Sequence, residues 1–326
     1  MPFPRFPLVP RLLLLAALAA PPALALALVL LCSTPAQAEI SVIDDQGQTI
    51  VLTRPARRVI ALYGALNEIL DGLGQTSRIV ARANADETPA SITKLPSIGT
   101  HRRSNIEVVL AQKPDLVLQM AGRKETSQSV EALKKHGVRV AVFRASSFAE
   151  LFSIIRRVGA LTGADAQAED MVRGMEARLA ALAARIANTA ERPRVFFEVH
   201  SPNMYGAGQS SVVAEIINHA GGVNCVEERV QFAHLSEEEL MWLKPEVYLI
   251  QRGPMNRSPL PLSARPRLRT LPAAQNSRAW FVDELKYSRP GPRNIDAAEE
   301  LAGLLHPELA GQGVKPPKGP KRKGKN

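Results

Sequence analysis

Aromatic and basic side chains recur in the segments that directly follow predicted strands. The candidates for ligand binding are Tyr63, His101, Arg102, Arg103, Tyr205, Phe232, Arg252 and Arg289. In parallel sheets such segments lie at the carboxyl ends of strands, where small molecules bind. The adjacent guanidinium groups of Arg102 and Arg103 suit an anionic ligand, because guanidinium pairs bidentately with oxygen anions; two solvated loop charges are the alternative. Tyr205 is interpreted as a binding-site aromatic, or else as the packing of a turn.

Motifs for metal binding and catalysis are absent from the sequence. Six histidines are present, of which only His101, His200 and His234 could converge, and no regular spacing unites them. Cys32 and Cys225 form neither a disulfide framework nor a CxxC site. The chain also lacks G-x-S-x-G, HExxH, GxxxxGK[ST], and a G-x-G-x-x-G after a strand. We therefore expect no enzyme and no resident cofactor or metal, with a zinc or manganese protein and a two-lobed α/β enzyme as alternatives.

Two α/β lobes joined by one helix are predicted to position these residues. From residue 57 onward, short apolar runs such as 59–62, 79–81 and 116–118 alternate with helical patterns, which is typical of βαβ units and a mostly parallel sheet. Residues 165–190 contain no proline and carry apolar side chains at intervals of three and four, which predicts a single helix. Trp242 and Trp280 fall within apolar patterns and are expected in the core.

An internal repeat supports the two-lobe interpretation. Residues 105–118 align without gaps to residues 236–249, at an offset of 131. Each copy reads as a polar start, a short helix, a Lys-Pro-acid turn and an apolar strand, with Glu107 and Glu238 at matching positions. Capping boxes are expected at Ser104–Glu107 and at Ser236–Glu239. The box glutamate is Glu107 itself in the first copy, where it can serve both in the cap and in a contact with a partner, whereas in the second copy it is Glu239, which leaves Glu238 free of the cap.

The two ends of the chain carry most of its net charge of +10. Residues 1–38 have the plan of a secretory signal peptide, with Arg5 and Arg11, an apolar run, and a small-residue end at Ala38; an uncleaved anchor or lipidation at Cys32 is the alternative. Residues 312–326 form a basic tail without an acid. Between these ends, 33 basic residues face 31 acidic ones, and no nucleic-acid-binding module is present. We therefore expect an exported protein that does not bind nucleic acid, and we expect it to be a monomer.

The predicted organisation is as follows: signal peptide 1–38, N-terminal α/β lobe 39–163, interlobe helix 164–192, C-terminal α/β lobe 193–311, and basic tail 312–326.

Residues 40–309 resemble the periplasmic substrate-binding proteins of ABC importers for ferric siderophores, haem and cobalamin. The resemblance rests on residues 58–62 with 67–70, 98–99 with 105–118, 220–224, 236–249 and 289–293. It implies two lobes on a rigid helix with a ligand cleft between them, and one exposed glutamate per lobe, Glu107 and Glu238, that docks onto arginines of the membrane permease.

The resemblance also implies the kind of ligand. Aromatic residues six positions before the docking glutamates sandwich a flat or bulky ligand in relatives, and these positions hold His101 and Phe232 here. The expected ligand is an iron complex, such as a ferric siderophore, or a corrinoid. Haem with His101 or Tyr63 as axial ligand is an alternative, although haem-binding relatives carry a Gly-Tyr step where this chain has Gly99-Thr100.

Overall fold

A computed structural model describes residues 39–100, 103–121, 124–189 and 191–312 of the chain. The expected signal peptide, Cys32, and all of the basic tail beyond residue 312 lie outside the described residues. Within these ranges, the first large sheet has four parallel strands in the order β4-β3-β5-β6. Its strands are β3 (Val59–Ala61), β4 (Ile79–Ala81), β5 (Leu116–Met120) and β6 (Val140–Phe143).

The second large sheet lies later in the chain and is mixed. Its strands are β7 (Arg194–His200), β8 (Tyr205–Ala207), β9 (Val223–Asn224), β10 (Phe232–His234), β11 (Val247–Arg252) and β12 (Ala279–Asp283). The order is β10-β8-β7-β11-β12, with β9 also paired to β7. Strands β7, β9, β11 and β12 run parallel, whereas β8 near one edge pairs antiparallel with both β7 and β10.

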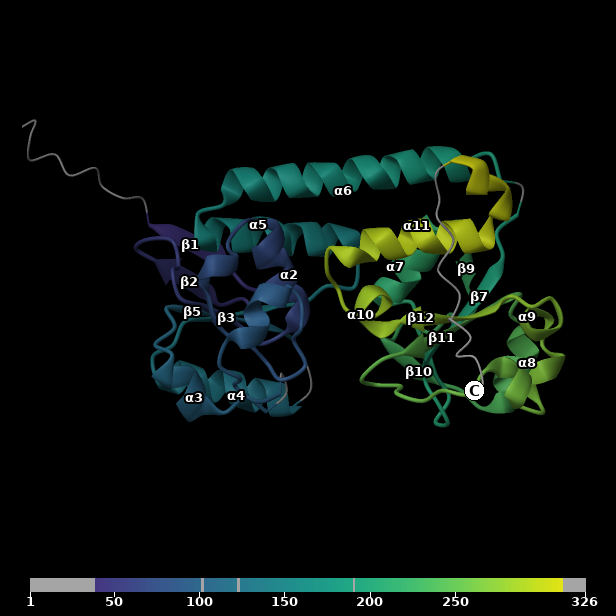
Figure 1. Cartoon of the computed structure of the whole chain (residues 1–326), viewed down its shortest axis with the longest axis horizontal. Coiled ribbons are helices and arrows are strands. Elements are labelled where there is room, and N and C mark those ends of the chain that lie inside the picture. Colours follow the sequence, from purple (N-terminus) through teal and green to yellow (C-terminus); the bar gives the residue numbers. More distant parts are fainter. Residues whose placement is uncertain (1–38, 101–102, 122–123, 190, 313–326) are drawn as a thin grey trace, which may run out of the picture. The chain divides into compact units, whose positions relative to one another are not determined.

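Helices cover both sheets (Figure 1). The α-helices are α2 (Gly64–Gly72), α3 (Ile106–Ala111), α4 (Lys124–Lys135), α5 (Phe148–Thr162), α6 (Asp165–Ile186), α7 (Val212–His219), α8 (Glu237–Leu243), α9 (Pro272–Gln275), α10 (Glu284–Tyr287) and α11 (Arg293–Leu305). Short 3-10 segments span Thr76–Arg78, Ala90–Lys94, Leu262–Ala264, Leu268–Thr270 and Pro307–Gln312. None of the helices in the described part of the chain combines the length and apolar character needed to cross a bilayer.

Alternating side chains bury both faces of the central strands. In β11, Val247 and Leu249 join an apolar cluster that includes residues of α5, α6, α7 and α11, whereas Tyr248 and Ile250 join a second cluster on the other face. Strand β3 divides in the same way between the first cluster and a third one. Parallel strands buried on both faces are typical of α/β proteins, and the predicted α/β class with mostly parallel sheets is confirmed.

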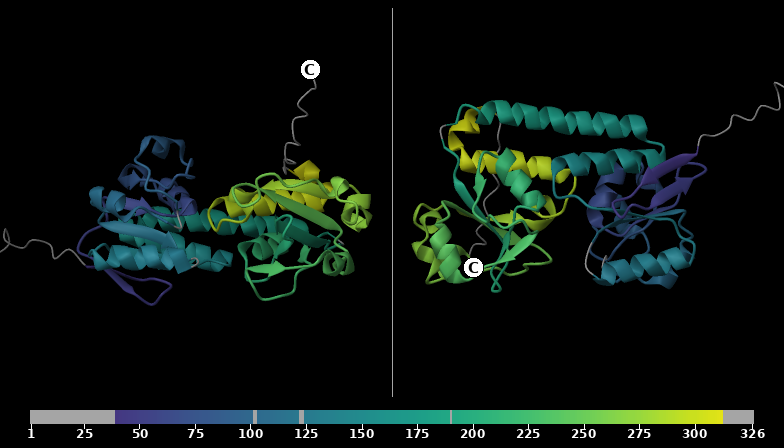
Figure 2. Two further views of the ribbon diagram at one scale, coloured as in Figure 1. Left: turned by 90° about the horizontal axis from the view of Figure 1, so that it is seen from below. Right: turned by 180° about the vertical axis from the view of Figure 1, so that it is seen from behind.

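The long predicted helix is present but ends earlier than expected. α6 stops at Ile186 instead of Ala190, because the Thr189 N–H and hydroxyl both donate to the Ile186 carbonyl oxygen and close the chain into a turn. Its 22 residues span about 33 Å. α6 lies beside α5 and α11 in Figures 1 and 2, and Arg178 of α6 forms ion pairs with Asp296 and Glu299 of α11.

The internal repeat is also a structural repeat. Lys113 and Lys244, which match in the alignment, both adopt positive φ, at 48° and 46°. The Arg58 guanidinium donates to the Gln112 and Lys113 carbonyls at the end of α3, and Arg194 donates to the Leu243 carbonyl at the end of α8. Each repeat therefore ends its short helix with a left-handed lysine and an arginine on the free carbonyls.

Only one of the two expected capping boxes forms. Ser236 and Glu239 exchange both hydrogen bonds at the start of α8. The prediction for Ser104 and Glu107 is wrong, because the N-cap of α3 is Asn105, whose side chain accepts from the Val108 N–H.

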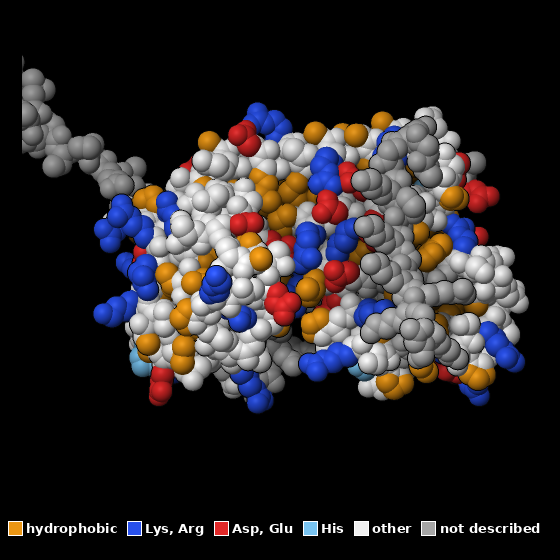
Figure 3. Space-filling view, viewed as in Figure 1, with side chains coloured by type: hydrophobic (Ala, Val, Ile, Leu, Met, Phe, Trp, Pro, Cys, Tyr) orange, Lys and Arg blue, Asp and Glu red, His pale blue; other side chains and the backbone are white. Residues whose placement is uncertain are grey.

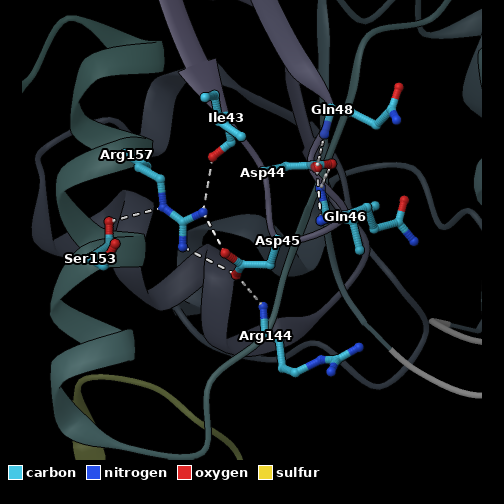
Figure 4. Close-up of polar contacts among 9 residues, drawn as sticks. Ile43, Asp44, Asp45, Gln46, Gln48, Arg144, Ser153 and Arg157 are labelled. Atoms are coloured by element: carbon cyan, nitrogen blue, oxygen red, sulfur yellow. Dashed lines mark hydrogen bonds and ion pairs between the residues drawn. The ribbon is translucent and has the colours of Figure 1, made fainter.

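A separate antiparallel hairpin, β1 (Ile40–Ile43) with β2 (Thr49–Leu52), is fixed to the first sheet by two adjacent aspartates (Figure 4). Buried Asp44 accepts backbone N–H bonds from Gln46 and Gln48 of the hairpin turn and from Val142 of β6. Asp45 accepts from Arg157 of α5 at 2.7 and 3.1 Å. These bonds hold the start of the folded body against β6 and α5.

Candidate functional site

An aromatic cluster lies on the β8–β10 edge of the second sheet. His234 of β10 is directly opposite Tyr205 of β8, and Phe232 is opposite Ala207. Because directly opposite residues of an antiparallel pair share a face, Tyr205, Phe232 and His234 lie on one face of the sheet. The rings of Tyr205 and His234 meet edge to face at 5.1 Å, and Tyr205 is 37% exposed. We call these three residues the aromatic cluster.

The structure thus brings together two of the predicted residues and adds one that was missed. From the sequence alone, His234 is only a candidate metal ligand. It follows Phe232 by two positions within a strand, and this spacing places both side chains on the same face. The alternation of the strand was therefore a usable signal for His234.

A second group of predicted residues meets around the start of α2. Tyr63 is the N-cap residue of α2, and the Arg289 guanidinium lies 5.7 Å from the centre of its ring. A Cβ added at Gly64 would stand 2.6 Å from Asp86 Oδ1 and 2.9 Å from Arg289 Nη1. Asp86 and Arg289 therefore approach the same glycine, and a larger residue there would displace at least one of these two side chains. We call Tyr63, Asp86 and Arg289 the interlobe cluster, since Arg289 follows the last strand of the second sheet.

Burial controls the protonation of this interlobe cluster. Asp86 is 4% exposed and accepts hydrogen bonds from Asn67 Nδ2 at 3.0 Å and from the Ala83 N–H at 3.3 Å. Burial raises the pKa of Asp86 from 3.8 to about 6, against the opposing effect of the Arg289 charge. Burial likewise raises the pKa of Tyr63 to about 12 and that of Glu284, on α10, above its ordinary value.

A bidentate ion pair lies in the same region. Arg293, at the start of α11, donates to both carboxylate oxygens of Glu68 in α2, at 2.8 and 2.6 Å. Acidic and basic side chains interleave between α2 and α10 in the space-filling view (Figure 3). The segment from Arg289 to Arg293 therefore contacts the first sheet's helix with both of its arginines.

The other predicted ligand residues are placed differently. His101 and Arg102 lie outside the described residues. Arg103 is exposed, and its backbone N–H donates to the Thr100 carbonyl and hydroxyl oxygens. Arg252, at the end of β11, holds its guanidinium 4.1 Å from the centre of the Phe281 ring. A hollow of about 380 Å³ lies elsewhere, beside the end of α6, and is lined by Ile186, Arg192 and His219 among others.

The two glutamates of the repeat are exposed on short helices. Glu107 lies in the first turn of α3 and Glu238 in the first turn of α8, and Figure 1 shows these helices on the side of the folded body away from α6. As expected, Glu238 takes no part in the capping box of α8, which uses Glu239; its carboxylate pairs with Arg267 at 2.9 Å. Both partners are largely exposed, at 74% and 69%, so the pair is weak.

Metal ligands do not cluster in the described part of the chain, where no group of three or more His, Cys, Asp or Glu is suited to hold an ion. His200 of β7 and His234 both pair with Tyr205 in the strand register, so this edge brings two imidazoles and one phenol into adjacent strands.

Comparison with known proteins identifies the relatives of the chain. The family described as periplasmic binding protein matches residues 59–284. The chain is 26% identical over 274 residues to the uncharacterized ABC transporter substrate-binding lipoprotein YvrC of Bacillus subtilis (strain 168), covering 82% of the chain and 86% of the relative. It is 23% identical over 248 residues to the vitamin B12-binding protein of Vibrio parahaemolyticus, covering 76% and 88%.

A solved structure extends the similarity to the fold. The periplasmic heme-binding protein RhuT from Roseiflexus sp. RS-1, in apo form, superposes with a TM-score of 0.67 and 26% identity. The match covers 77% of this chain and 98% of RhuT.

Proposed function

The chain belongs to the periplasmic binding protein family, and from this premise we propose that it captures an iron complex, such as a ferric siderophore, or a corrinoid, and delivers it to the permease of an ABC importer. It does so as an exported monomer without catalytic activity and without a resident cofactor. Its relatives are binding proteins. Because YvrC is named as a lipoprotein, a lipid anchor at Cys32 is the alternative form of the mature N-terminus.

The aromatic cluster carries the proposal. Tyr205, Phe232 and His234 offer ring faces for van der Waals contact with a flat or bulky chelate, at the exposed edge of a sheet. The same cluster offers a phenol oxygen and an imidazole nitrogen, which are donors that ferric iron and cobalt accept. The arginines Arg252 and Arg289 add positive charge that favours an anionic chelate.

Haem is the second candidate, and the similarity to RhuT favours it. A tyrosine or a histidine holds haem iron in several protein classes. In this chain Tyr205 and His234 supply those side chains in the second sheet, in place of the first-sheet residues His101 and Tyr63 that sequence analysis considered.

The test is a binding titration of the purified chain against a ferric catecholate, a ferric hydroxamate, haem and cyanocobalamin. After ultrafiltration, the absorbance of each ligand measures how much of it the protein retains. We expect saturable binding of one of them at micromolar or lower concentration. His234→Ala and Tyr205→Ala should then weaken binding at least tenfold, whereas Val223→Ala, an exposed position on β9, should leave it unchanged. Tyr205→Phe distinguishes contact through the aromatic ring from coordination by the phenol oxygen, because it keeps the ring and removes the oxygen. Binding of none of the four ligands would refute the proposal.

A further inference from the structure

Trp242 lies on the outer face of α8, contrary to the expectation that it belongs to the core. Its side chain is 83% exposed. In the same helix Leu240 is fully buried, and Met241 and Leu243 pack against the second apolar cluster. A seven-residue helix on a sheet buries one face only, and Leu240 occupies the middle of that face. The indole is therefore not needed to hold α8 in place.

Trp242 and Glu238 form one outward ridge. They are four residues apart in the helix, so their side chains are neighbours on its surface. Glu238 is 74% exposed, and Glu237 and Glu239 share the first turn with it. We call Glu238 and Trp242 the α8 ridge. It combines a carboxylate with a large apolar ring, and Trp is among the residues that contribute most to binding at protein interfaces.

The repeat makes this ridge asymmetric. The residue that matches Trp242 in the first copy is Ala111, the last residue of α3. Glu107 and Glu238 thus present similar carboxylates in the two copies, whereas only the second copy adds an aromatic ring. A partner that contacts both glutamates would meet two different surfaces.

The resemblance implies that Glu238 docks onto a basic residue of the permease; beyond this, we propose that Trp242 is a further docking residue, whose indole enters an apolar pocket beside that basic residue. This rests on the proposed function. Because electrostatic pairs of exposed side chains set orientation more than affinity, Trp242 supplies most of the affinity at this end and fixes which lobe faces which permease subunit.

Charge argues for this partner over two others. Three glutamates surround the start of the ridge, and Arg267 pairs with two of them. An anionic lipid surface would be repelled by this net negative charge. A second copy placed symmetrically would bring two acidic helix starts together. A basic and apolar protein surface complements the ridge.

In-cell photo-crosslinking tests the proposal. Benzoylphenylalanine replaces Trp242 in the full chain, and Ala111 in a matched control, and adducts formed under ultraviolet light are identified by mass spectrometry. We expect the probe at position 242 to yield an adduct with an ABC permease subunit, several times more than the probe at position 111. Adducts at position 242 with a second copy of the chain or with lipid, or no adduct, would overturn the proposal.

Affinity for the detergent-solubilised permease gives the second measurement. Trp242→Ala should weaken binding roughly tenfold or more, and Trp242→Phe should weaken it less. The unfolding temperature should stay unchanged, because the side chain is exposed. If Glu107→Ala and Glu238→Ala weaken binding but Trp242→Ala does not, this inference fails alone. If the chain binds neither the permease nor any of the four ligands above, the proposed function fails with it.

Discussion

Asp86 is a buried carboxyl group whose pKa is raised to about 6. It lies against Gly64 and beside Arg289, with two hydrogen bonds from Asn67 and Ala83. Burial disfavours its charged form, which the nearby guanidinium offsets only in part. At neutral pH the ionised carboxylate is therefore retained at a cost in stability.

Replacing Asp86 by asparagine should change how stability depends on pH. The pKa of Asp86 is about 6 in the folded chain and has an ordinary value of 3.8 when exposed. Between these values the folded state holds the proton more tightly, so the free energy of unfolding falls as pH rises through this window, by on the order of 3 kcal/mol. The amide of the Asp86→Asn variant does not titrate. Urea unfolding from pH 3.5 to 7.5 should show this loss in the wild type and not in the variant; parallel curves would contradict it.

Chain position alone placed Tyr63 and Arg289 where the two sheets face each other, and their role in ligand binding stays a prediction. Tyr63 and Arg289 follow strands at the carboxyl edges of their sheets and meet as neighbours. Asp86 was missed because it belongs to no motif, and Arg289, which approaches the same glycine, is 203 positions away. Contacts over such separations leave no local signal in a single sequence.

Helix starts can be tested at the scale of the element, since the repeat offers matched positions. Ser236→Ala removes the cap of α8 and should lower the free energy of unfolding by about 1 kcal/mol. Ser104→Ala, at the position expected to cap α3, should cost less than about 0.5 kcal/mol, because its hydroxyl does not cap the helix. Asn105→Ala should cost about as much as Ser236→Ala. Thermal unfolding of the three variants provides the measurement, and an equal loss for both serines would refute the assignment of Asn105 as the cap.

Apolar periodicity predicted the strands and helices themselves, but it did not predict which of their side chains face water. Strands β3, β5 and β11 follow from short apolar runs, and the repeat located α3 and α8. In α8 the run Leu240-Met241-Trp242-Leu243 is apolar all round, so the pattern does not tell which side chain faces water. The packing of Leu240 into the second apolar cluster decides this, and it leaves Trp242 outside.

The two sheets are joined by polar contacts as well as by a shared apolar cluster. That cluster includes residues of α5, α6, α7 and α11, and the bidentate pair of Glu68 with Arg293 links α2 to α11. The Glu68 side chain is 11% exposed, so the pair is screened less than a surface pair. A rigid connection between the sheets would keep the interlobe cluster and the aromatic cluster at a constant separation, which suits a protein that binds its ligand without large closure.

A double-mutant cycle measures this connection. Glu68→Ala and Arg293→Ala should each lower the free energy of unfolding by about 2 kcal/mol, since each leaves a half-buried charge without its partner. The double variant should lose less than the sum, by about 1 kcal/mol or more. Hydrogen exchange should then rise at the start of α11 and in α2, while the β1–β2 hairpin, held by Asp44 and Asp45, stays protected. Strict additivity of the two losses would show that the pair does not couple the two sheets, and the connection would then rest on α6 and its apolar neighbours.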